Sequence, residues 1–303
     1  MAKFEIVMIG NTSVGKTSML SVLSRELKKF NKAGKLQLKP TSSEFDILDD
    51  KWNELLKEIE QSDECLPVRA KLGATADFIE HPFEFRVEGK KKCDVVFVDS
   101  PGQFTRKRNE GLVERINNAF GVFCVVDASV MMAGSESKNN EYNRPAAVEE
   151  MLNTVFTDGD GKQPRFVSFI LTKCEKWMAD GKGRKNLAKK FHTCFGETIS
   201  MLNDASNPPN IYMMAIQTLG CVEFSEIDDA TGEPVFVVIE KSLKPKDCAY
   251  PLVVMLRNII ESLAEDSTIL DWFLILLGIS KDIKDYLAVL EDRISLPDLY
   301  EEL

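Results

Sequence analysis

The sequence predicts an α/β fold in three layers, with helices on both faces of a mostly parallel sheet that has one antiparallel edge strand. Short apolar runs alternate with stretches of helical periodicity along the 303-residue chain, as they do where parallel strands are joined by crossover helices. The apolar runs are bounded by polar residues, Gly or Pro, which is typical of buried parallel strands. One further run alternates apolar and polar residues before a turn, which indicates an antiparallel hairpin.

The expected strands and helices follow one another in order. The strand runs read “KFEIVMIG”, “CDVVFVDSPG”, “GVFCVVDAS”, “RFVSFILT” and “NIYMMAIQ”. Helical patterns fall between or after these runs, at about residues 16–28, 107–118, 144–156, 183–203 and 250–265. The edge hairpin is expected in “HPFEFRVEGKKKCDVVFVD”, with its turn at “EGKK”.

Two regions are additional to the strands and helices that a minimal sheet of this kind requires. Residues 30–72 separate the first helix from the edge strand and contain a helical pattern, “DDKWNELLKEIEQ”, while residues 266–303 follow the last crossover helix and look helical again. A further hairpin is expected in “CVEFSEIDDATGEPVFVVIE”. We therefore predict one domain over residues 1–265 with a helical insertion at about 30–72, followed by a C-terminal helical extension over 266–303.

The composition narrows the classes of function. A net charge of −10 and a pI of about 5.0 argue against a general nucleic-acid binder. Seven cysteines without CxxC spacing and only two histidines predict reduced structural thiols rather than disulfides or a zinc site. The chain opens directly on a strand and shows no lipidation motif, so we expect a cytoplasmic protein without a signal peptide or a membrane anchor.

The stretch after the first strand carries the strongest chemical signal. It matches the pattern GxxxxGK[ST] and lies between a strand and a helix. Glycines allow tight turns and close approach to a ligand, and the N–H groups of the loop and the helix N-terminus then bind phosphate. Lys16 is expected to reach the β- and γ-phosphates, Thr17 to bind Mg²⁺ and Ser18 to lie near the α-phosphate. The nucleotide-binding residues predicted here are Gly10, Asn11, Thr12, Ser13, Val14, Gly15, Lys16, Thr17 and Ser18.

The stretch “DSPGQ”, at the end of an expected strand, indicates which branch of the phosphate-loop proteins the chain resembles. Asp99 ends a buried strand, Gly102 follows three residues later, and Gln103 is next. A carboxylate at that place holds Mg²⁺ through water, a glycine lets its N–H approach the γ-phosphate, and a glutamine orients the attacking water. With these residues the chain resembles the Ras-like and translation-factor-like GTPases. The resemblance implies a P-loop NTPase G domain that binds GTP and GDP, with Mg²⁺ as cofactor.

The resemblance also implies a first-switch threonine that completes the Mg²⁺ shell and senses the γ-phosphate. It should lie between the first helix and the edge strand, where Thr41 and Thr75 are the candidates. Thr75 is preferred because it lies six residues before the expected edge strand, whereas Thr41 precedes the helical pattern of the insertion. The predicted catalytic residues are Lys16, Thr75 and Gln103, and the predicted metal ligands are Thr17, Thr75 and Asp99.

A base-recognition motif, [NT]KxD, is implied after the fifth strand. Here the motif reads Thr172-Lys173-Cys174-Glu175. In the family, the lysine stem packs on the purine and the carboxylate accepts from guanine N1 and N2. Glu175 stands where the family has Asp, so one more methylene must be accommodated.

Other stretches carry weaker signals. The resemblance places the family's final base-contacting loop at Ala215 and Ile216, whose backbone would then contact the guanine oxygen. Asp127 ends the strand “GVFCVVDAS” and is expected to cap it without taking part in chemistry. The basic run after Gln103 is a candidate for stabilising phosphoryl charge in cis, although such a run is more often a solvated helix start. The apolar C-terminal segment is expected to pack on the domain or to bind a partner.

These motifs predict a soluble GTPase switch in which nucleotide and Mg²⁺ order the loops around Thr75 and Gly102. The insertion, the late hairpin and the helix “YPLVVMLRNII” are also loosely similar to predicted bacterial double-GTPase-type families. That similarity implies a regulatory role in a multi-protein system, with a protein effector or regulator as partner. The alternatives are an ATP-dependent P-loop ATPase or kinase, and a nucleotide-bound scaffold without catalysis.

Overall fold

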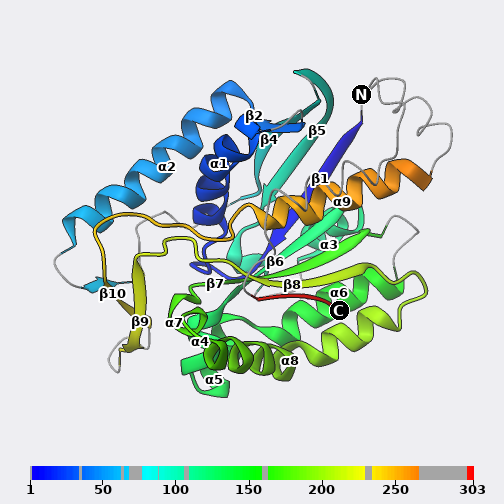
Figure 1. Cartoon of the computed structure of the whole chain (residues 1–303). Helices are drawn as coiled ribbons and strands as arrows, with labels where there is room; N and C mark the ends of the chain where they lie inside the picture. Colours follow the sequence, from blue (N-terminus) through cyan, green and yellow to red (C-terminus); the bar gives the residue numbers. More distant parts are fainter. Residues whose placement is uncertain are drawn as a thin grey trace.

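The structure is a computed structural model, and it describes residues 2–33, 36–62, 65–67, 77–87, 89–105, 109–158, 163–228, 234–265 and 299–303. These residues form an α/β fold around an eight-stranded, mostly parallel sheet with helices on both faces (Figure 1). The arrangement is compatible with the three-layer fold that the sequence predicts.

The main sheet has its first strand near the centre. Its strand order is β11 (Tyr300–Glu302), β8 (Asn210–Ala215), β7 (Phe166–Thr172), β6 (Gly121–Asp127), β1 (Lys3–Ile9), β5 (Lys90–Asp99), β4 (Ile79–Val87) and β2 (Leu36–Pro40). The strands from β8 to β5 in this order run parallel to one another. β4 pairs antiparallel with β5, which confirms the predicted edge hairpin.

The prediction of a single antiparallel edge strand is wrong. β2 pairs antiparallel with β4 at one edge, and β11 pairs antiparallel with β8 at the other. Both strands, “LQLKP” and “YEE”, are too short for a periodic signal to be recognised in the sequence. β11 also corrects the extension predicted as helical over 266–303, because its last residues form a strand; residues 266–298 lie outside the described residues.

The crossover helices lie where the sequence predicts them, within a few residues. They are α1 (Lys16–Ala33), α3 (Glu110–Asn117), α6 (Pro145–Asp158), α8 (Gly181–Asn203) and α9 (Tyr250–Glu265). The helical pattern of the insertion forms α2 (Ser42–Gln61), which packs against α1. The sequence pattern does not predict the short helices α4 (Ala128–Ala133), α5 (Glu136–Tyr142) and α7 (Glu175–Met178).

Alternate residues of the parallel strands belong to two hydrophobic cores, one on each face of the sheet. On β1, Ile6 and Met8 pack with residues of α1 and α9, while Val7 and Ile9 pack with residues of α3, α6 and α8. Figure 1 shows α1 and α9 on one side of the sheet and α6 and α8 on the other. Because helices cover both faces, a ligand site in such a fold is built from the loops at the strand ends.

A second, three-stranded sheet includes part of the insertion. β10 (Pro234–Val238) pairs with β9 (Val222–Ile227), which confirms the predicted late hairpin, and with β3 (Cys65–Pro67) from the insertion. Its core joins Phe224 and Phe236 to Ile59 of α2. The insertion is therefore tied to the late hairpin as well as to α1.

The cysteine side chains that the structure describes are free thiols, and most of them are buried. Burial raises the pKa of both Cys93 and Cys124 to about 12, so these thiols stay protonated. This agrees with the structural role expected from the sequence. Within the part of the chain that the structure describes, no helix has both the length and the apolar character needed to cross a membrane.

Candidate functional site

The stretch between β1 and α1, residues 10–17, forms a tight loop that we call the phosphate loop. Gly10 has φ 141° and Gly15 has φ 103°, in the region that favours glycine. A Cβ on Gly10 would also lie 2.6 Å from the carbonyl oxygen of Val125 on β6. Gly10 thus has both features that its place in the motif predicts, an unusual backbone angle and a close approach to a neighbour.

Lys16, the first residue of α1, bonds back to this loop. Its ammonium donates to the carbonyl oxygens of Gly10 at 2.8 Å and Asn11 at 3.2 Å, and the side chain is only 7% exposed. Burial lowers the pKa of the Lys16 ammonium, and the negative charge of Asp99 opposes that shift. A buried cation held mainly by neutral carbonyls would be stabilised by an anion bound at the loop.

Asp99 ends β5, which is the neighbour of β1, and therefore lies beside the phosphate loop. Thr17 Oγ1 donates to Asp99 Oδ2 at 2.6 Å, and the Lys16 ammonium lies 3.9 Å from Asp99 Oδ1. Asp99 is fully buried, and its Oδ1 accepts no hydrogen bond from the described residues. A buried carboxylate oxygen without a donor is costly unless a cation or a water completes its surroundings.

Gly102 begins a short 3₁₀ helix, η1 (Gly102–Thr105), and its backbone lies directly on the phosphate loop. A Cβ there would lie 2.1 Å from the amide nitrogen of Thr12 and 2.6 Å from the carbonyl carbon of Asn11. Gln103, the next residue, is exposed. The structure therefore brings the “DSPGQ” stretch onto the loop, while the basic run that follows lies outside the described residues.

The two candidates for the first-switch threonine differ in their surroundings. β4 begins at Ile79, which pairs with Asp99, so the chain enters this strand beside the carboxylate. Thr75, four residues earlier in the sequence, lies outside the described residues. Thr41 precedes α2, donates its N–H to the Pro82 carbonyl at 3.1 Å, and has a buried hydroxyl. Thr41 bonds to Pro82, three residues along β4 from the pair formed by Ile79 and Asp99, so it lies two strand spacings across the sheet and about 10 Å along it from that carboxylate.

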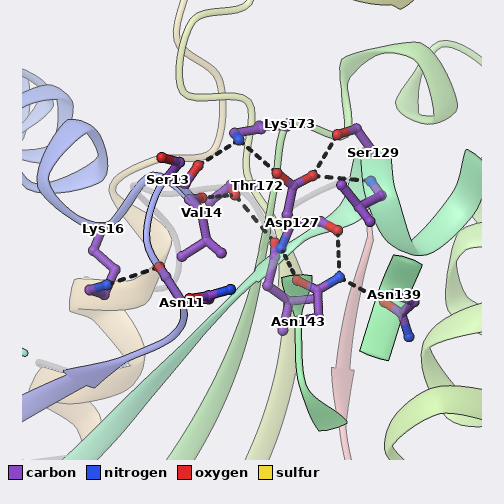
Figure 2. A network of polar contacts seen from close by, with 12 residues as sticks. Asn11, Ser13, Val14, Lys16, Asp127, Ser129, Asn139, Asn143, Thr172 and Lys173 are labelled. Atoms are coloured by element: carbon purple, nitrogen blue, oxygen red, sulfur yellow. Dashed lines mark hydrogen bonds and ion pairs between the residues drawn. The ribbon is translucent and has the colours of Figure 1, made fainter. Parts of the chain in front are cut away.

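Thr172 and Lys173, at the end of β7, bind the phosphate loop. Thr172 Oγ1 donates to the carbonyl oxygen of Val14 at 2.6 Å, and the Lys173 ammonium donates to that of Ser13, also at 2.6 Å (Figure 2). The predicted base-recognition motif and the phosphate loop, far apart in the sequence, therefore form one bonded unit.

Glu175, the first residue of α7, is buried and faces the loop that follows β8. Its Oε1 accepts from the N–H of Gly220 at 3.3 Å, and its Oε2 has no hydrogen-bond partner in the part of the chain that the structure describes. Burial raises the pKa of the Glu175 carboxyl group, and bonds from backbone N–H groups, including those of Gly220 and Leu219, only partly offset the rise. The structure therefore accommodates the longer side chain by bonding it to this loop.

Ala215 and Ile216 lie at the end of β8, and their N–H groups are already bonded. The N–H of Ala215 donates to the Leu299 carbonyl at 3.1 Å, and that of Ile216 donates to the Leu171 carbonyl at 2.9 Å. A contact from either N–H to a base would require one of these bonds to open. Glu175 instead bonds to the loop at Gly220, which follows these residues in the chain.

Aromatic residues outside any motif lie beside Lys173, in the predicted base-recognition motif, and beside Lys176, which follows it. The ammonium of Lys173 lies 6.0 Å from the ring centre of Phe236 on β10, and that of Lys176 lies 5.2 Å from Phe224 on β9. Trp177 of α7 packs on Phe224, with ring centres 5.5 Å apart. Sequence reasoning missed these neighbours because the hairpin that carries them shows only strand alternation.

Asp127 does more than end its strand. Oδ1 accepts from the N–H of Val130 at 3.1 Å and so caps α4, and Oδ2 accepts from the Lys173 ammonium at 2.6 Å (Figure 2). The expectation of a simple strand cap therefore needs correction: Asp127 caps a helix and binds Lys173 of the predicted base-recognition motif.

The glycine-rich loop, Lys16, Thr17 and Asp99 form a polar, largely buried group at the ends of β1 and β5. A loop of this kind can bind phosphate, and the hydroxyl and carboxylate are oxygen ligands that suit a hydrated divalent cation. In the described residues, no group of three or more His, Cys, Asp or Glu side chains is placed to hold a metal ion. Neither a scan against models of protein families nor a search of curated proteins found a match to the chain.

Proposed function

We propose that the chain is a GTP-binding molecular switch that hydrolyses GTP to GDP with Mg²⁺. The observation that carries this proposal is the buried group of Lys16, Thr17 and Asp99, in which the carboxylate has one bonded and one unbonded oxygen. A triphosphate with its cation would satisfy both the ammonium and the unbonded oxygen. The strand order of the main sheet and the bonds from Thr172 and Lys173 to the phosphate loop support a G-domain arrangement.

Thr17 and Asp99 fit a Mg²⁺ ion by the chemistry of their donors. The threonine hydroxyl would bind the ion directly and the carboxylate would bind through water, as hard oxygen ligands do. The ion would supply neutralisation of the charge that develops on the phosphate oxygens. Lys16 would hold the β- and γ-phosphates, and Thr75 stays the predicted first-switch residue.

Hydrolysis is assigned to the stretch that lies on the phosphate loop. Gly102 would offer its N–H to the γ-phosphate, and the exposed Gln103 beside it would orient the attacking water. Intrinsic turnover should be slow, as it is for switches that lack a supplied arginine.

One observation favours an alternative, a P-loop ATPase or kinase. Glu175 is already bonded to Gly220, and its pKa is raised by burial, which weakens its expected preference for guanine. A competition assay distinguishes the GTPase from the ATPase or kinase. Labelled GDP is bound to the protein with Mg²⁺, and its displacement by unlabelled GTP is compared with its displacement by unlabelled ATP. We expect GTP to displace the label at least about tenfold more effectively than ATP does. This ratio is modest beside the selectivity of sites that recognise a substrate group by hydrogen bonds. Equal displacement by ATP would remove Glu175 from base recognition.

Phosphate release under multiple turnover separates the switch from a nucleotide-bound scaffold. Gln103→Leu should slow release about tenfold or more while leaving nucleotide affinity within about twofold, because Gln103 acts on the water and not on the ground state. Gln37→Leu on β2, remote from the loop, is the matched control. No release above background from wild-type protein that holds nucleotide would favour the scaffold.

The switch would report its nucleotide state to a protein effector or regulator within a multi-protein system in the cytoplasm. A net charge of −10 supports a protein partner rather than nucleic acid. The predicted contact is the C-terminal segment, of which residues 266–298 lie outside the described residues.

A further inference from the structure

The chain makes an excursion between β6 and α6 that returns to the phosphate loop and the base-recognition residues. This excursion, residues 127–144, contains α4 and α5. Asn11 of the phosphate loop donates its side-chain N–H to the Glu141 carbonyl at the end of α5, at 3.2 Å. Asp127, at the start of the excursion, binds Lys173. Two contacts therefore join the excursion to residues that the proposed function assigns to nucleotide binding.

The Asp127 carboxylate is buried, only 2% exposed, and both of its oxygens are engaged. Oδ1 accepts from the hydroxyl of Ser129 and the N–H of Val130, and Oδ2 accepts from the Lys173 ammonium at 2.6 Å. A buried carboxylate with donors at both oxygens has little freedom to rotate, so it holds the ammonium at a defined place.

The backbone of Asp127 is fixed independently of its side chain. Its N–H donates to Asn143 Oδ1 at 2.8 Å, and its carbonyl oxygen accepts from Asn143 Nδ2 at 3.0 Å. Asn143 Nδ2 also donates to Asn139 Oδ1 on α5 at 2.8 Å. Figure 2 shows these residues as one continuous network from the two asparagines through Asp127 and Lys173 to Ser13.

Lys173 needs such support for two reasons. Its φ is 54°, a left-handed backbone conformation that a lysine adopts only when its surroundings hold it there. Its side chain is also long and loses much rotational freedom when the ammonium is fixed. The carbonyl of Ser13 is a neutral acceptor, whereas Asp127 supplies the charge that makes the position favourable.

We propose that Asp127 is a positioning residue of the nucleotide site, which acts through Lys173 and does not touch the ligand. The inference rests on the proposed function. With its ammonium held between Asp127 and Ser13, Lys173 keeps its stem beside the purine site and keeps the phosphate loop joined to the base-recognition residues before nucleotide binds. Less ordering is then required on binding, which raises affinity.

A double-mutant cycle on nucleotide affinity tests the proposal. The affinity of the full chain for fluorescent GDP with Mg²⁺ is measured for wild type, Asp127→Asn, Lys173→Met and the double variant. We expect Asp127→Asn to weaken binding about tenfold, in line with loss of a charge-assisted bond. In the Lys173→Met background the same change should weaken binding less than about twofold, because the ammonium that Asp127 holds is gone.

Two further variants separate positioning from folding. Ser129→Ala removes the hydroxyl bonded to the other carboxylate oxygen and should leave affinity within about twofold, since the contact with Lys173 stays. Asp127→Ser keeps a residue that caps helices well but cannot place a carboxylate against Lys173, so it should lower affinity like Asp127→Asn even if the latter folds poorly.

Additive losses in the cycle would overturn the proposal, because they would show that Asp127 acts on the fold and not through Lys173. Unchanged affinity in Asp127→Asn and Asp127→Ser would overturn it as well. Failure of the proposed function looks different: wild-type protein would then bind no purine nucleotide, and both inferences would fall together.

Discussion

The phosphate end and the base end of the candidate site satisfy their charges in different ways. At the phosphate end, the Lys16 ammonium bonds to neutral backbone carbonyls, and one oxygen of the buried Asp99 accepts no hydrogen bond. At the base end, Lys173 is paired with the carboxylate of Asp127 at 2.6 Å, and Glu175 accepts from Gly220 through one oxygen while its other oxygen, like that of Asp99, has no partner among the described residues. The two ends therefore differ in their lysines: Lys16 bonds to neutral carbonyls and lies 3.9 Å from the nearest carboxylate, whereas Lys173 is held by a carboxylate within the protein.

This difference indicates which end should supply affinity and which selectivity. Buried charges gain most when a ligand of opposite charge replaces neutral acceptors, so affinity is expected mainly from the phosphate end. At the base end, a purine has to share or exchange contacts that already exist, so the free energy gained there is smaller. Substitutions at one end, each compared with a matched position elsewhere in the chain, test this division.

Lys16→Met should have the largest effect. Removing the ammonium removes a charge-assisted bond to phosphate, worth about 2.7 kcal/mol, so nucleotide affinity should fall about 100-fold. The unliganded protein should lose no more than about 1 kcal/mol of stability, because the burial that lowers the pKa of Lys16 is a cost that the variant avoids. Calorimetry with GDP and Mg²⁺, together with urea unfolding, measures both quantities.

Lys138→Met on α5 is the control for that experiment, since the Lys138 side chain is about one-third exposed and its ion pair in the described residues is with the exposed Glu141 at 3.5 Å. It should leave affinity and stability close to wild type. A Lys16→Met protein that binds GDP as tightly as the control would show that the phosphate end does not supply affinity.

The phosphate end is also the part of the site that the sequence predicts best. The loop, with Lys16 and Thr17, is one local motif, and Asp99 is the last residue of the neighbouring strand. Apolar runs are enough to locate both strands in the sequence. The same runs predict the parallel strands and the crossover helices. Signals of this kind depend on residues close together in the chain, which is why they are readable without a structure.

The base end depends on contacts that no local pattern encodes. Asp127 and Lys173 are 46 residues apart, and Phe236 reaches Lys173 from a hairpin that follows later in the chain. The helix α4 follows β6 without a break, so “VVDASVMMA” gives no sign that a helix begins directly after Asp127. The strands β2, β3 and β11 are too short for a periodic signal, and their pairing depends on tertiary structure.

Gly102→Ala should have the next largest effect, because it forces the “DSPGQ” stretch away from the phosphate loop. The added Cβ would lie 2.1 Å from the Thr12 amide nitrogen, and backbone atoms cannot give way as a flexible side chain can. We expect a loss of about 2 kcal/mol in unfolding free energy and slower phosphate release.

Gly196→Ala is the matched control for Gly102→Ala. Gly196 lies within α8, where an added Cβ meets nothing within 4 Å, so alanine should stabilise the protein by up to about 1 kcal/mol. Urea unfolding and a phosphate-release assay on both variants measure the contrast. If the two variants had equal stability, the close backbone contact at Gly102 would not exist in solution.

Glu175→Gln should have the smallest effect and acts only at the base end. Burial raises the pKa of Glu175 above its ordinary value of 4.5, so the folded protein binds this proton more tightly than the unfolded chain does. Its contribution to stability is therefore present at low pH and is lost as pH rises through the folded-state pKa. Glutamine cannot ionise, so the decline in unfolding free energy as the pH rises above 4.5, measured by urea unfolding, should be smaller in this variant than in the wild type.

The same variant tests whether the base end supplies selectivity. Glutamine offers one acceptor where the carboxylate offers two, so the preference for GTP over ATP should fall while affinity for the shared phosphates stays close to wild type. Glu223→Gln, at an exposed position on β9, is the control and should change neither the pH dependence nor the preference. A Glu175→Gln protein that lost affinity for GTP and ATP equally would contradict the division between the two ends, because Glu175 would then support the whole site rather than the base alone.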